Sequence, residues 1–125
     1  HDDVVRLLEQ HGYRGKPVVF HCFGGGPDEA ADLRSRGWRV SFSGVLTFKK
    51  ARDAQAACAE TPVDQILFET DAPYLSPEPV RSKRPNEPAF VAHTVRFAAQ
   101  LRGETFESLA AASTANALGF FRMMR

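Results

Sequence analysis

Two apolar runs of the sequence each end in side chains that can bind a metal ion. The run Ile66 to Phe68 is followed by Glu69 and Asp71, and the run Val18 to Phe20 is followed by His21. Imidazole and carboxylate groups are ligands for divalent cations, and both need a rigid support that fixes the coordination geometry. The ends of buried strands give such support, so the two runs together indicate a metal-dependent hydrolase.

Each of these side chains could also have a purely structural role. A histidine such as His21, taken alone, is more often held by hydrogen bonds in a core, and Glu69 and Asp71 could form a solvated acidic turn before Pro73. Residues two positions apart on a strand point to the same face, so Glu69 and Asp71 are expected to share one surface. There Asp71 could bind the metal or accept a proton from a water molecule that the metal activates.

Cationic and glycine-rich segments near the strand ends are candidate phosphate sites. Arg81, Lys83 and Arg84 lie in the long polar loop 72–86 and could position a phosphodiester near the metal. A solvated run of charges is an equally good explanation. The glycines 24–26 precede a predicted helix and could bind phosphate through backbone N–H groups, although a plain turn is the commoner role of such a segment.

Aromatic residues flank the same strand ends. Phe23, Phe48 and Tyr74 could stack on a nucleobase at the mouth of the site. Core packing is the simpler role for Phe48.

Helices and strands alternate along the chain, and they determine where these side chains lie. Such alternation is typical of a parallel sheet with right-handed crossovers, in a closed barrel or an open sheet. Two short helices are expected over 106–112 and 114–123. Apolar spacing and breakers predict strands over 17–23, 38–43 and 66–68, and helices that end at Gly12, Gly37, Thr61 and Gly103.

Composition narrows the class of protein. The 125 residues, 43% of them hydrophobic, suit one α/β domain, and a net charge of +1 means that any contact with nucleic acid needs a local basic patch. Cys22 and Cys58 have no disulfide or metal-ligand spacing, so we expect reduced thiols and a cytoplasmic protein. No apolar run reaches the ~20 residues that span a bilayer, so no membrane partner is expected.

Several short motifs, in this order along nearly the whole chain, resemble the TatD family of metal-dependent hydrolases. They are His21-Cys22-Phe23-Gly24-Gly25, Ser41-Phe42-Ser43-Gly44, Thr47-Phe48-Lys49, Glu69-Thr70-Asp71-Ala72-Pro73-Tyr74-Leu75, Lys83-Arg84 with Asn86-Glu87-Pro88, and Thr114-Ala115-Asn116-Ala117.

The resemblance implies a TIM barrel with two divalent ions at its mouth, most simply Mg²⁺ and otherwise Mn²⁺ or Zn²⁺. It implies a DNase or 3′ to 5′ exonuclease that cleaves phosphodiester bonds in DNA by a metal-activated water. His21 would be the metal ligand after the sixth strand, and Asp71 the ligand and proton acceptor after the eighth. Glu69 would be a supporting acid that faces the lumen, while Asn86 and Glu87 would order the loop over the site.

The departures from the family pattern indicate an incomplete domain. The His-x-His pair of the first strand, the glutamate of the fourth and the histidine of the fifth are absent, so residues 1–125 correspond to strands 6 to 8 of a TIM barrel. We therefore expect one partial α/β domain that needs the missing N-terminal part of the barrel as its partner. Three strands cannot close a barrel, so the chain alone is expected to be marginally stable and inactive.

Two other functions remain open at this point. The same barrel could act as an esterase or amidase on a small substrate, because related hydrolases share a fold and metals but differ in their loops. The chain could also be a non-catalytic fragment that folds or binds only with a partner.

Overall fold

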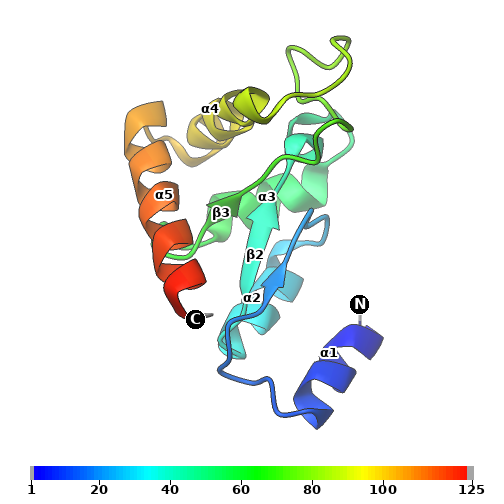
Figure 1. Cartoon of the computed structure of the whole chain (residues 1–125), viewed down its shortest axis with the longest axis vertical. Helices are drawn as coiled ribbons and strands as arrows, with labels where there is room; N and C mark the ends of the chain where they lie inside the picture. Colours follow the sequence, from blue (N-terminus) through cyan, green and yellow to red (C-terminus); the bar gives the residue numbers. More distant parts are fainter. Residues whose placement is uncertain (1, 124–125) are drawn as a thin grey trace.

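The structure, a computed structural model, describes residues 2–123 as three parallel strands with helices between and after them. Figure 1 shows the chain running from α1 through the sheet to α5. The elements are α1 (Asp2–Gln10), β1 (Val19–Phe20), α2 (Pro27–Ser35), β2 (Arg39–Phe42), the 3₁₀ helix η1 (Gly44–Thr47), α3 (Arg52–Glu60), β3 (Leu67–Phe68), the 3₁₀ helix η2 (Pro88–Phe90), α4 (Val91–Arg102) and α5 (Phe106–Met123).

The sheet has the order β1-β2-β3, and both pairs of strands are parallel, as the alternation of elements predicts. Phe20 is paired with Val40, and Phe42 is paired with Phe68. The backbone continues the ladder beyond β3, since the Glu69 N–H donates to the Phe42 carbonyl at 3.0 Å. All three strands therefore deliver the residues that follow them to one edge of the sheet.

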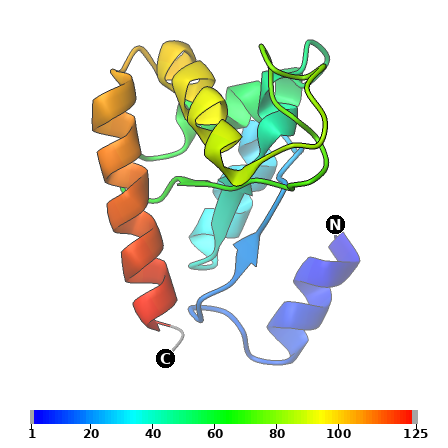
Figure 2. The same cartoon turned by 45° about the horizontal axis from the view of Figure 1, so that its top comes forward.

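The core lies between the sheet and the helices, and its largest buried side chain is Trp38. The Trp38 indole N–H donates to the Tyr13 carbonyl at 2.9 Å, which satisfies its one polar atom and ties the segment before β1 to β2. Helix α3 packs between α2 and α4, and α5 packs against β3 and α4. Helix α1 lies away from α4 and α5, on the other side of the molecule (Figures 1 and 2).

The prediction of two short helices after position 105 is wrong, because α5 is one continuous helix over Phe106–Met123. Its middle contains small residues and no proline, so nothing interrupts the backbone hydrogen bonds. The Asn116 amide also donates to the carbonyls of Val63 and Ile66 at 2.8 and 3.0 Å. This contact fixes the middle of α5 against the start of β3.

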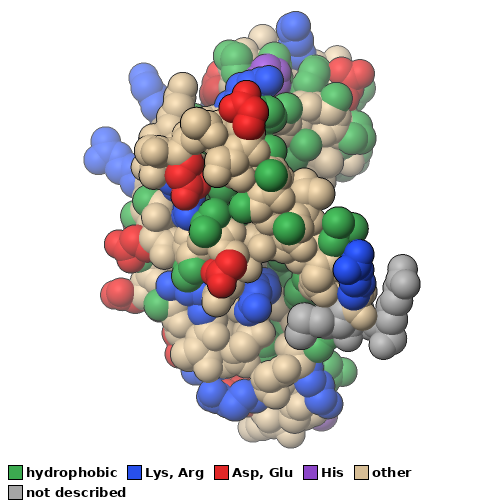
Figure 3. Space-filling view, turned by 90° about the vertical axis from the view of Figure 1, so that its left-hand side faces the viewer, with side chains coloured by type: hydrophobic (Ala, Val, Ile, Leu, Met, Phe, Trp, Pro, Cys, Tyr) green, Lys and Arg blue, Asp and Glu red, His purple; other side chains and the backbone are tan. Residues whose placement is uncertain are grey.

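The surface formed by α4 and α5 mixes hydrophobic and charged side chains. Figure 3 shows apolar side chains scattered among acidic and basic ones on this face, without a large patch of one charge. Leu101, Leu118 and Phe121 are its exposed large hydrophobic residues. Among residues 2–123, the helices are too short or too polar to cross a bilayer.

Candidate metal centre and adjoining cavity

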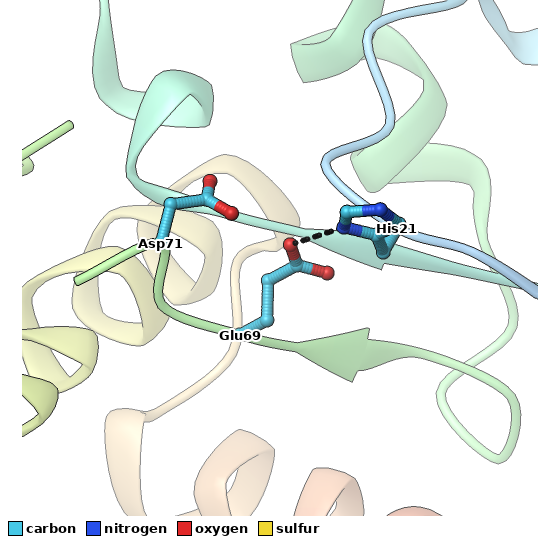
Figure 4. Close-up of side chains that lie close together, drawn as sticks. All are labelled: His21, Glu69 and Asp71. Atoms are coloured by element: carbon cyan, nitrogen blue, oxygen red, sulfur yellow. Dashed lines mark hydrogen bonds and ion pairs between the residues drawn. The ribbon is translucent and has the colours of Figure 1, made fainter. Parts of the chain in front are cut away.

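His21, Glu69 and Asp71 meet at the carboxyl edge of the sheet. His21 follows β1 directly, while Glu69 and Asp71 lie on the segment that leaves β3 (Figure 4). One ligand atom from each residue can be chosen so that all three lie within 4.8 Å of one another. The parallel pairing explains this convergence, because strands separated by nearly 50 positions end at the same edge.

Glu69 holds the histidine in place. Its Oε1 atom lies 3.3 Å from Nδ1 of His21 and accepts a second hydrogen bond from the Cys22 N–H at 3.1 Å. An ionised carboxylate can only accept, so Nδ1 carries the proton in this contact, and the lone pair of Nε2 is left for a cation. The His21 side chain is 75% exposed and that of Glu69 is 18% exposed, so the imidazole faces open space from a mostly covered support.

Asp71 has an unsatisfied oxygen. Its Oδ2 atom is buried and has no hydrogen-bond partner among the described residues. A buried carboxylate oxygen without a partner is costly, because its hydration is lost and nothing replaces it. A divalent cation between Asp71 and His21 would remove that cost, so these residues fit a metal centre on their geometry and on their chemistry.

Cys22 lies beside this cluster, although the spacing of the cysteines in the sequence does not single it out. The residue has a positive φ of 48°, and its Sγ lies 3.2 Å from Oγ of Ser43. Burial raises the pKa of the Cys22 thiol; the hydrogen bond to Ser43 lowers it, and the nearby Asp71 and Glu69 carboxylates raise it further. A raised pKa favours the protonated thiol, which is less nucleophilic than a thiolate. The only sequence signal for this position is its place next to His21.

Asn86 fastens the loop 72–86 that leaves the metal cluster. The side chain is buried, and its amide donates to the Tyr74 carbonyl at 2.7 Å and to Oγ1 of Thr70 at 3.3 Å. The Asn86 N–H also donates to the Pro73 carbonyl at 2.9 Å. Glu87, by contrast, is exposed and contributes only its carbonyl, which accepts from Phe90, so it does not reach the site.

The same loop packs tightly on the turn between β2 and η1. A Cβ atom on Gly44 would lie 2.5 Å from the Leu75 carbonyl oxygen, so only glycine allows the two backbones to come this close. Nearby, Oγ1 of Thr47 accepts from the Glu78 N–H at 2.8 Å. In Figures 1 and 2 this loop stands next to η1 at the end of the molecule towards which β1 and β2 point.

A cavity of about 660 Å³ lies in the loop 72–86, beside the residue that follows η1. Phe48 contributes to its wall, and the guanidinium carbon of Arg81 lies 3.8 Å from the centre of the Phe48 ring. Arg84 and Tyr74 also line the cavity, and Tyr74 is 73% exposed. Of the three predicted phosphate ligands, Arg81 and Arg84 line this cavity together, whereas Lys83 is not among its lining residues. The Lys83 N–H donates to the Val80 carbonyl at 2.8 Å, and its carbonyl accepts from the Ser76 hydroxyl at 2.7 Å.

Two expectations about the aromatic residues are wrong. Phe23 is buried in the core, 5% exposed, where its ring makes an edge contact with Phe42, so it is not free to stack on a base. Phe48 is a cavity residue and does not belong to the buried core. Phe23 follows Cys22, whose φ is positive, and Phe48 follows η1; residue spacing reveals neither feature.

The glycine-rich turn does not form a phosphate cradle. Gly26 caps the start of α2 through its carbonyl, which accepts from the Ala30 N–H. The Glu29 carboxylate occupies the space over Gly25 where a side chain would lie. A negative charge in that position opposes the binding of a phosphate.

Comparison with known proteins gives one family. The sequence pattern of the family described as "TatD related DNase" matches residues 1–122. The chain is 38% identical to the uncharacterized metal-dependent hydrolase YabD of Bacillus subtilis, and the match covers 98% of this chain and 48% of YabD. It is 39% identical to the uncharacterized metal-dependent hydrolase TatD of Mycobacterium tuberculosis, over 92% of this chain and 43% of that protein.

Solved structures give the same result for the fold. The crystal structure of YJJV, a TatD homolog from Escherichia coli, superposes with a TM-score of 0.81 at 27% identity, over 93% of this chain and 44% of that one. A TatD family hydrolase from Entamoeba histolytica superposes with a TM-score of 0.85 at 18% identity, over 95% of this chain and 46% of that one. The chain spans about half the length of the relatives that it matches.

Proposed function

Since the chain belongs to the TatD-related DNase family, we propose that it is part of a metal-dependent hydrolase that cleaves phosphodiester bonds in DNA. The observation that carries this proposal is the convergence of His21, Glu69 and Asp71 at one edge of the sheet, with a buried Asp71 oxygen that lacks a partner. Arg81 and Arg84 in the adjoining cavity supply positive charge next to this cluster, as a phosphodiester substrate requires.

Each residue of the cluster has a separate role. His21 and Asp71 bind the cation, and Glu69 orients the imidazole through Nδ1. A bound divalent ion lowers the pKa of water and polarises a phosphoryl oxygen. Asp71 would accept the proton of the attacking water through the carboxylate oxygen that does not face the ion.

The chain supplies only part of the centre. Three parallel strands leave an open edge, so we assign them to strands 6 to 8 of a TIM barrel whose remaining strands carry further ligands and a second ion. Carboxylate-rich sites favour Mg²⁺ or Mn²⁺, whereas histidine also suits Zn²⁺. The chain without the rest of the barrel is expected to hold metal weakly and to be inactive.

A small ester or amide is the second candidate substrate. A cavity of about 660 Å³ is within the range of pockets that hold small molecules. An uncharged substrate would make no use of Arg81 and Arg84, which is why DNA is preferred.

The test is a cleavage assay on the protein with the complete barrel. Labelled DNA should be cleaved with Mg²⁺ or Mn²⁺ and left intact in EDTA. Asp71→Asn should abolish turnover with an unchanged circular dichroism spectrum, while Asp64→Asn, an exposed acid before β3, should keep wild-type activity. Metal-dependent hydrolysis of nitrophenyl esters without cleavage of DNA would favour the small substrate, and full activity of Asp71→Asn would remove Asp71 from its role.

A further inference from the structure

We infer that the cavity formed by the loop 72–86 and Phe48 is a nucleotide subsite, in which Tyr74 stacks on a base and Arg84 binds the adjacent phosphate. The inference rests on the proposed function, because it places one nucleotide of the substrate beside the bond that is cleaved. It adds a binding site separate from the metal ligands.

The position of the cavity follows from the backbone. Pro73 lines the cavity and lies two residues after Asp71, and the Tyr74 N–H donates to the Asp71 carbonyl at 2.8 Å. The segment that carries the metal ligand therefore also forms the wall of the cavity. A DNA strand whose phosphate is held at the metal centre would therefore place its neighbouring nucleotide at the cavity.

Tyr74 provides an unused aromatic surface. Its side chain is 73% exposed, and its ring makes no aromatic or cation–π contact with any residue between 2 and 123. An aromatic ring in open solvent is available to a base, and such stacking contributes to binding with little dependence on sequence. The exposed Tyr74 ring is thus a stacking platform at the entrance of the cavity.

The two arginines of the cavity have different roles. Arg81 is held against the Phe48 ring at 3.8 Å, so its guanidinium plane forms part of the wall. Arg84 makes no ion pair within the described part of the chain, and its charge is available to a phosphate. The acids nearest in sequence, Glu78 and Glu87, do not line the cavity, so no carboxylate there competes for Arg84.

The cavity is formed before any ligand binds. Asn86 holds the end of the loop to its beginning through the Tyr74 carbonyl, and the contact of Gly44 with Leu75 holds the loop on η1. A preformed site avoids the entropy cost of ordering a loop on binding. This rigidity distinguishes the cavity from a mobile surface loop that happens to carry arginines.

The test measures binding in the absence of catalysis. A short fluorescein-labelled oligothymidylate is titrated with the protein in EDTA, and fluorescence anisotropy gives the Kd. We expect Tyr74→Ala to weaken binding about tenfold and Tyr74→Phe to retain it, since the phenyl ring keeps the stacking surface. Arg84→Ala should weaken binding and reduce the slope of log Kd against log salt by about one. The controls are Tyr13→Ala and Arg6→Ala, which remove an exposed ring and an exposed charge far from the cavity.

A second probe tests the base itself. The wild type should bind an oligonucleotide with one abasic position more weakly than the intact oligonucleotide. Tyr74→Ala should bind the two oligonucleotides equally. Unchanged binding of Tyr74→Ala and Arg84→Ala, in a protein that still cleaves DNA with Mg²⁺, would overturn the subsite and leave the proposed function standing. Wild-type protein that neither binds the oligonucleotide nor cleaves DNA would overturn both.

Discussion

The Nδ1 atom of His21 lies 3.3 Å from Oε1 of Glu69, although 48 positions separate the two residues. The same carboxylate oxygen accepts from the Cys22 N–H, so the acid holds both the imidazole and the backbone that carries it. Carboxylates that hold a ligand histidine in this way fix its tautomer and increase its basicity. We therefore expect Glu69 to affect metal binding even where it is not itself a ligand.

Glu69→Gln should lower the affinity for Mn²⁺ about 10- to 100-fold, because the amide can present its N–H to Nδ1 and favour the wrong tautomer of His21. Calorimetric titration with Mn²⁺ measures this loss. Glu107→Gln, an exposed acid in the first turn of α5, is the matched control and should bind as the wild type. Equal affinity of the two variants would show that Glu69 does not position the histidine.

Asn86→Ala should destabilise the chain by about 1 to 3 kcal/mol, because the Tyr74 carbonyl and the Thr70 hydroxyl lose a buried donor. Urea denaturation followed by circular dichroism gives the free energy of unfolding. Ser82→Ala, an exposed change in the same loop, should be neutral. A neutral Asn86→Ala would mean that the other contacts of the loop, such as the packing of Leu75 on Gly44, hold it without this amide.

The sheet and the metal cluster were predictable because both depend on local sequence. Apolar runs of the correct length predict the three strands, and parallel pairing then brings His21 and Asp71 to one edge without knowledge of the packing. The junction near position 113 was predicted wrongly as a break in a helix. The alanines around Ser113 and Thr114 favour a continuous helix, and the contact of Asn116 with Val63 and Ile66 holds this part of α5 on the sheet.

The cavity could not be predicted, because it depends on contacts between distant residues. Phe48, Tyr74 and Arg81 come together only when the loop packs on Gly44, and no periodicity marks a loop. The surroundings of Cys22 could not be predicted for the same reason, since Ser43 and Asp71 follow other strands. Residue types alone single out Arg84 and Tyr74 as candidates, but they do not reveal that both residues line one cavity.

Gly44→Ala should cost about 1 to 3 kcal/mol of stability, since the added Cβ would lie 2.5 Å from the Leu75 oxygen and the loop would have to move. Thermal unfolding compares this variant with Gly24→Ala, where a Cβ would meet no atom within 4 Å. Gly44→Ala should also weaken oligonucleotide binding, because the cavity lies under the displaced loop. Equal melting temperatures for the two variants would contradict the close packing of the loop on η1.

The two thiols should react at very different rates. Burial raises the pKa of Cys58 to about 12, and this side chain is 0% exposed. Cys22 is partly exposed, with a pKa that is raised chiefly by burial. With Ellman's reagent at pH 8, we expect slow reaction of Cys22 in the native state and reaction of Cys58 only after unfolding. Cys22→Ser should remove the native-state phase, and a rapid reaction that remains in that variant would contradict the burial of Cys58.

Contact between α1 and α2 should depend on pH through Glu9. The hydrogen bond from Arg36 holds the pKa of Glu9 below its usual value; partial burial opposes this shift, and Arg14 adds to it. A carboxylate with a lowered pKa in the folded state stabilises the fold above the unfolded-state value of about 4.3, and the contribution is lost as the pH falls through the lowered value. As the pH falls from 7 to 3, the melting temperature of Glu9→Gln should therefore fall less steeply than that of the wild type. The control is Glu60→Gln, which changes an exposed acid at the end of α3 and should follow the wild type. The same acid sensitivity in Glu9→Gln and the wild type would show that the ion pairs of Glu9 do not hold α1 in place.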